Sequence, residues 1–70
     1  MSLSLMSCAD ALKQQQFLEK SYPTCKVEPA TGLIQRNGYD YILVQPDGQL
    51  IAVKFYPGSE NKIASLRNVR

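Results

Sequence analysis

The sequence predicts an α+β domain in which one N-terminal helix packs on an antiparallel β-meander of three to four strands. Two patterns support this fold class. Apolar residues recur at helical spacing in the first third of the chain, up to Pro23. Beyond it, short segments of β-forming residues are separated by turn sequences, of which Asn37-Gly38 and Pro46-Asp47-Gly48 are the strongest. With 44% hydrophobic and 20% charged residues, the 70-residue chain has the composition of one small globular domain, 1–70, rather than of a disordered segment.

The helix is expected from Cys8 to Lys20. Ser7 and Asp10 have the spacing of a capping box, in which the two side chains satisfy free amides of the first turn. Pro23 ends the helix because the residue before a proline is pushed out of the α region. Gln15 interrupts the expected buried face, and Phe17 points nearly opposite to it. That face carries Cys8, Ala11, Leu12, Leu18 and Tyr22.

Proline, glycine and turn sequences divide the rest of the chain into β-strand candidates. Pro29 ends the first of them, and Pro57-Gly58 ends the fourth. The last segment is open between a strand that extends the meander and a short helix capped by Ser59, with the strand favoured because it follows a turn. The expected strands are 25–28, 33–36, 39–45, 49–56 and 62–69.

The turns set the register of these strands. A three-residue loop at Pro46-Asp47-Gly48 pairs Gln45 with Gln49, and a two-residue loop at Asn37-Gly38 places Ile34 opposite Tyr41. Because side chains alternate across a strand, two faces follow. The face expected to receive the helix carries Ile34, Tyr39, Tyr41, Leu43, Ile51, Val53 and Phe55. The second face carries Leu33, Ile42, Val44, Leu50, Ala52 and Tyr56.

The second face is the candidate partner-binding site. It is largely apolar, and a chain with one clear helix has little left to cover it. Its six apolar side chains would form a patch on the order of several hundred Å², a size at which a protein partner becomes the favoured explanation. The alternative is that the C-terminal segment, or the segment before the helix, folds over this face.

Two polar pairs on the strands have a structural interpretation. Asp40 is expected opposite Lys54, as an exposed cross-strand ion pair rather than a catalytic carboxylate and lysine. Arg36 beside Tyr39 suggests a cation–π contact rather than an anion site.

The residues that carry enzyme chemistry are missing from the sequence. The chain has no histidine, which is the commonest general base and transition-metal ligand, and its six carboxylates are spread singly. Gly38-Tyr39-Asp40 followed by Ile51-Ala52-Val53-Lys54 superficially resembles a nuclease metal site, but Ala52 stands where the second acidic ligand is needed. We therefore expect a non-enzymatic protein without catalytic residues, metal or cofactor.

Two cysteines, Cys8 and Cys25, are too few for the disulfide framework of a small secreted protein. Half-buried free thiols are favoured over a single bridge between the helix and the first strand. Leu5-Met6-Ser7-Cys8 resembles the lipobox of bacterial lipoproteins, yet residues 1–7 lack the basic start and apolar run of a signal peptide. We expect residues 1–7 to be disordered or the remnant of a leader, and no stretch of the sequence has the length of a membrane span.

A further pattern runs through the β-rich part of the chain. It consists of Tyr22-Pro23 at the helix end, then Tyr39-Asp40-Tyr41-Ile42-Leu43-Val44, Asp47-Gly48, Ile51-Ala52-Val53-Lys54-Phe55 and Asn61-Lys62-Ile63-Ala64-Ser65-Leu66. Over about residues 9–69 this pattern resembles the PepSY and PepSY-like domains. The resemblance implies a helix followed by a three-stranded meander. It also implies a non-catalytic envelope or secreted module that binds or inhibits proteins, with peptidases among the proposed targets.

The leading interpretation is a protein-binding or inhibitory module that acts through the second sheet face, toward another protein or a second copy of itself. One alternative is nucleic-acid binding by Lys54, Lys62, Arg67 and Arg70 with sheet tyrosines as stacking platforms. The net charge of +2 and the scattered basic residues disfavour it. Another alternative is a structural homodimer subunit. The compartment stays open: cytoplasmic by default, or envelope or secreted if the lipobox or the PepSY resemblance is functional.

Overall fold

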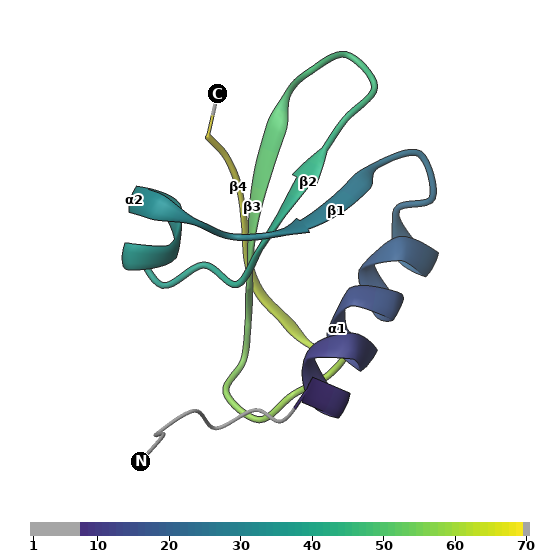
Figure 1. Ribbon diagram of the computed structural model, residues 1–70, viewed down its shortest axis with the longest axis vertical. Coiled ribbons are helices and arrows are strands. Elements are labelled where there is room, and N and C mark those ends of the chain that lie inside the picture. The colour runs from purple at the N-terminus through teal and green to yellow at the C-terminus, as the bar shows by residue number, and fades with distance from the viewer. Residues whose placement is uncertain (1–7, 70) are drawn as a thin grey trace.

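The computed structural model describes residues 8–69 and confirms the α+β class. Its elements are α1 (Cys8–Ser21), β1 (Lys26–Pro29), α2 (Gly32–Arg36), β2 (Tyr41–Val44), β3 (Leu50–Phe55) and β4 (Ile63–Asn68). The four strands form one antiparallel sheet in the order β1-β2-β3-β4, with α1 and α2 on opposite sides of it (Figure 1). The expectations for residues 1–7, including the Ser7 cap, lie outside the described residues.

The predicted length of α1 is confirmed, but the predicted buried face is wrong in part. Leu18 is fully buried and Tyr22 packs against the core, as expected. Leu12, however, is 53% exposed, whereas Phe17 packs against the core and Gln14 is only 1% exposed. Gln14 can occupy a buried position because its amide Nε2 donates a hydrogen bond of 2.7 Å to the carbonyl of Ser59.

The core lies between α1 and the central strands. The register of the β2–β3 hairpin is the predicted one, with Tyr41 opposite Val53 and Leu43 opposite Ile51. The Tyr41 hydroxyl donates to the carbonyl of Ala11 at 2.9 Å and so ties β2 to α1. Phe55 makes edge-to-face contacts with Phe17 and Tyr41, at ring-centroid distances of 6.2 and 5.9 Å. The buried cluster consists of Leu18, Tyr41, Leu43, Val53 and Phe55.

The predicted strand 33–36 is wrong, because these residues form the short helix α2. The Asn37-Gly38 pair that suggested a hairpin instead ends this helix. Gly38, with φ of 93°, donates to the Gln35 carbonyl at 2.9 Å, and Tyr39 donates to the Ile34 carbonyl at 3.3 Å. These two bonds are those of a Schellman motif, which needs a left-handed residue after the helix.

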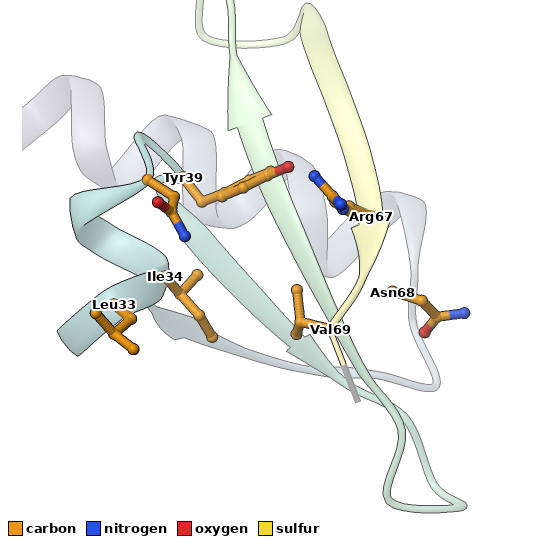
Figure 2. A pocket seen from close by; sticks show the side chains of 7 residues that line it. Leu33, Ile34, Tyr39, Arg67, Asn68 and Val69 are labelled. Carbon is orange, nitrogen blue, oxygen red and sulfur yellow. The ribbon is translucent and has the colours of Figure 1, made fainter.

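Because residues 33–36 are helical, Ile34 and Tyr39 do not lie on the core face of the sheet, where they were predicted. Ile34 lies on α2 and lines a groove together with Tyr39, on the side of the sheet away from α1 (Figure 2). The ambiguous tail is resolved in favour of the strand: β4 pairs with β3 through a β-bulge, with Lys54 opposite Ser65 and Phe55 opposite Ile63. The second sheet face therefore includes residues of β4, and the short helix α2 lies on its side of the sheet.

Candidate partner-binding surface

The six residues predicted for partner binding do not form one open patch. Ala52 is 0% exposed and Ile42 is 8% exposed within the protein itself. Val44 and Leu50 are half-buried, whereas Leu33 on α2 and Tyr56 after β3 are exposed. α2 and the Tyr39 side chain stand over this face (Figure 2). The C-terminal strand also borders the middle of this face, because Arg67 of β4 lies opposite Ala52.

One apolar row remains partly open on this face. Val44 of β2 lies opposite Leu50 of β3, and the Val69 amide donates to the Leu50 carbonyl at 3.0 Å. Side chains of directly opposed residues point to the same side of a sheet. Val44, Leu50 and Val69 therefore form a cross-strand row, here called the apolar row, and all three are half-buried.

A groove adjoins the apolar row. It runs between α2 and the C-terminal end of β4 and has a volume of about 510 Å³. Figure 2 shows Leu33 and Ile34 on its helix side and Val69 and Arg67 on its strand side. Val69 belongs to both features, so the groove and the apolar row are one continuous surface. The lining residues are Leu33, Ile34, Asn37, Tyr39, Arg67, Asn68 and Val69.

The rim of the groove is basic. The Tyr39 side chain reaches across β3 toward Arg67 (Figure 2), and the Lys54 ammonium lies 5.1 Å from the centre of the Tyr39 ring. A hydrogen bond from Ser65, followed by one from Arg67, lowers the pKa of the Tyr39 phenol below its ordinary value. Hydrogen bonds donated to the phenolate favour the charged form. One cation, Arg67, and the Tyr39 ring thus line a groove of mixed polarity, and a second cation, Lys54, lies against that ring.

The titration of two tyrosines follows from these contacts. Because its pKa is lowered, Tyr39 should ionise at a lower pH than an ordinary tyrosine. Burial, followed by the negative charge of Asp40, raises the pKa of Tyr41. Ser65→Ala should raise the pKa of Tyr39, and Ser21→Ala, at an exposed site on α1, should leave it unchanged. Ring resonances followed by NMR across alkaline pH would measure both groups. A Tyr39 pKa that does not respond to Ser65→Ala would contradict the assigned contact.

The two groups have opposite effects on folding. For Tyr39, whose pKa is lowered on folding, the added stability is present above the unfolded-state pKa and is lost as pH falls through the folded value. For Tyr41, whose pKa is raised, stability is lost as pH rises from the unfolded value through the folded one.

The predicted polar pairs are both replaced by other contacts. The Asp40 carboxylate accepts a hydrogen bond of 2.9 Å from the Phe55 amide. Among the side chains of residues 11–69 the ion pairs are Lys13–Glu60 and Lys26–Glu28, so the expected Asp40–Lys54 pair is wrong. The cation on Tyr39 is Lys54 rather than Arg36. Asp40 thus holds the start of β2 against the end of β3, which is a structural role.

Other candidate chemistry is limited in the part of the chain described. Cys25 is a free, half-buried thiol, as the favoured interpretation of the cysteines requires. Among the described side chains, those of residues 11–69, no three histidine, cysteine or acidic groups gather as they would around a metal ion. None of the described helices is long and apolar enough to cross a membrane. No protein-family model, curated protein or solved structure shows a significant match to this chain.

Sequence reasoning missed Ile34, Tyr39 and Val69 as members of this surface. The signal that could have placed the first two is the pair of glycines that bracket α2, Gly32 and Gly38, both at positive φ. A glycine five or six residues after another, with Asn before the second, is compatible with one short helix as well as with a hairpin.

Proposed function

We propose that this domain is a non-catalytic protein-binding module that contacts its partner through the apolar row and the groove beside it. The observation that carries the proposal is the continuity of this surface from Val44 over Leu50 and Val69 to Leu33 and Ile34. Leu33, 72% exposed, projects from α2 at its border. The exposed leucine extends the apolar surface that the half-open row offers to a partner.

The rim sets the character of the partner. Arg67 lines the groove and Lys54 lies against the Tyr39 ring beside it, so acidic side chains around an apolar anchor on the partner would complement this surface. An inhibitory role toward peptidases is the more specific form of this proposal. It rests on the resemblance to PepSY-like modules.

Nucleic-acid binding receives less support from the same geometry. Stacking platforms need open aromatic faces. Tyr41 is buried in the core, and the Lys54 ammonium lies over the ring of Tyr39. Arg67 donates to the Tyr39 phenol, which reduces the donors it can offer a phosphate.

The proposal is tested by charge substitution on the surface. Leu33→Glu and Leu50→Glu should each reduce partner capture from an extract of the source cells at least about tenfold, because a charge forced into an apolar contact costs 1.4 kcal/mol or more, roughly. Leu12→Glu is the matched control: Leu12 is also exposed, but lies on α1, across the sheet. Quantitative mass spectrometry of captured proteins gives the readout, and circular dichroism confirms folding.

Two outcomes would count against the proposal. Capture that falls equally with Leu12→Glu would indicate nonspecific adhesion. Capture that survives both surface substitutions in folded protein would place the partner elsewhere on the domain.

A further inference from the structure

The two edges of the sheet differ in what they offer to another strand. The outer strands are β1 and β4. In an antiparallel ladder, alternate residues turn their N–H and C=O groups toward the neighbour, and the residues between them turn these groups outward. One observed hydrogen bond on each edge strand therefore shows which residues turn their backbone N–H and C=O groups outward.

On β1 the outer edge is blunted. Ala30 donates to the Asp40 carbonyl at 3.0 Å, so Glu28 also faces β2, while Val27 and Pro29 face outward. Pro29 has no N–H to donate. A proline at this position is a common protection of an edge strand.

On β4 no other strand of residues 8–69 pairs with the outer edge. Val69 donates to the Leu50 carbonyl, so Arg67 and Ser65 also face β3, and Leu66 and Asn68 turn their N–H and C=O groups outward. The segment from Ile63 to Asn68 contains neither proline nor lysine. The Leu66 side chain, 47% exposed, lies at this edge on the α1 side of the sheet. A strand with free backbone groups and an exposed apolar side chain is a template for a further strand.

We propose that a second copy of this chain pairs with β4 in antiparallel fashion around a two-fold axis at Leu66, so that two sheets join into one of eight strands. In this register Leu66 lies opposite Leu66 of the second copy, and Asn68 lies opposite Ala64. The outward backbone groups of Leu66 and Asn68 then have partners. The two exposed leucines cover each other, and Arg67 faces Ser65 of the other copy.

Neighbouring registers are less favourable for reasons visible in β4. An axis at Arg67 would place two guanidinium groups directly opposite each other in a closely spaced pair, where like charges repel. An axis at Ser65 would leave Leu66 against the small Ala64 and bring Arg67 against Ile63. Of these three registers, only the one with its axis at Leu66 places leucine against leucine and Arg67 against the neutral hydroxyl of Ser65. This self-complementarity is why the occupant is a second copy.

The test begins with the mass of the intact chain. The wild-type protein should change from 7.8 kDa toward twice that mass as concentration rises over roughly a hundredfold range in sedimentation equilibrium. In hydrogen exchange, the amides of Leu66 and Asn68 should slow at high concentration. Leu66→Lys should abolish both effects, because it sets two cations on the axis. Leu12→Lys, at an exposed site on α1, should abolish neither.

A cross-link tests the register itself. In a background with both native cysteines replaced by serine, Leu66→Cys should form a disulfide-linked dimer on air oxidation, since Cα atoms of a hydrogen-bonded pair are about 5.5 Å apart. Leu12→Cys, equally exposed on α1, should stay monomeric.

The proposal is overturned by a wild-type chain that remains a monomer across the range. It is also overturned by a dimer that survives Leu66→Lys, which would use another face. Neither result bears on partner capture by Leu33, so this inference and the proposed function fail separately.

Discussion

Leu43→Ala should remove about 2–5 kcal/mol from the free energy of unfolding, which is about half of the stability of a domain of this size. Leu43 is fully buried on a central strand, with Val27 opposite it on β1 and Ile51 opposite it on β3. Shortening it removes apolar contacts and leaves a cavity that neighbouring strands cannot close. A domain of 70 residues has about 4–10 kcal/mol in total, so the variant should stay folded in water but unfold at a much lower urea concentration.

The matched control is Leu12→Ala, the same chemical change at an exposed site on α1. It should alter the free energy of unfolding by less than about 0.5 kcal/mol. Urea denaturation followed by circular dichroism measures both variants. Similar losses for the two would mean that α1 is packed the other way around, with the predicted face of Leu12 inward after all.

The parts of the fold that the sequence predicted correctly are set by local chemistry. Pro46-Asp47-Gly48 dictates a three-residue hairpin loop, and the observed Gln45–Gln49 hydrogen bond and the Leu43–Ile51 pair follow from it. Gly48 has the expected positive φ, at 90°. Alternation along β2 and β3 then assigns Tyr41, Leu43, Val53 and Phe55 to the core without further information.

The parts that were missed depend on contacts between distant residues or on very short elements. α2 has five residues, too few to show a helical period, and Asn37-Gly38 is chemically suited both to a hairpin and to a helix end. The rotation of α1 is decided by Gln14, whose hydrogen-bond partner Ser59 lies 45 positions away. No local pattern can reveal such a pair.

The candidate site was predicted in outline for the same reasons. That the second face is apolar follows from strand alternation alone. Which of its residues stay open depends on contacts beyond the hairpin, since Ile42 and Ala52 lie on central strands and are buried, with Arg67 of β4 opposite Ala52. Leu33, Val44 and Leu50 keep a place in the proposed surface, and Ile34 and Val69 join them.

Gln14→Glu should destabilise the domain at neutral pH by about 3 kcal/mol or more, and this loss should disappear in acid. The side chain is buried, its Nε2 donates to the Ser59 carbonyl, and its Oε1 has no hydrogen-bond partner among the described residues. A carboxylate there would lose its water and face a carbonyl oxygen, with no donor to satisfy it. Both effects raise the pKa of a buried glutamate, by roughly two pH units or more in comparable sites, at about 1.36 kcal/mol per unit.

The sign of the pH dependence distinguishes this cause from a packing defect. Because the pKa of the introduced carboxyl would be raised on folding, the variant is penalised above the unfolded glutamate value of about 4.3, and the penalty grows with pH until the folded pKa is passed. Below about pH 4, the protonated acid can again donate to Ser59, and the variant should match the wild type. Gln16→Glu, the same change at an exposed position of α1, should show no such trend. The measurement is the difference in urea midpoint between each variant and wild type from acid to neutral pH. A deficit in Gln14→Glu that stays constant with pH would mean that the carboxylate has swung out to solvent, leaving only a lost hydrogen bond and an unfilled space beside Ser59.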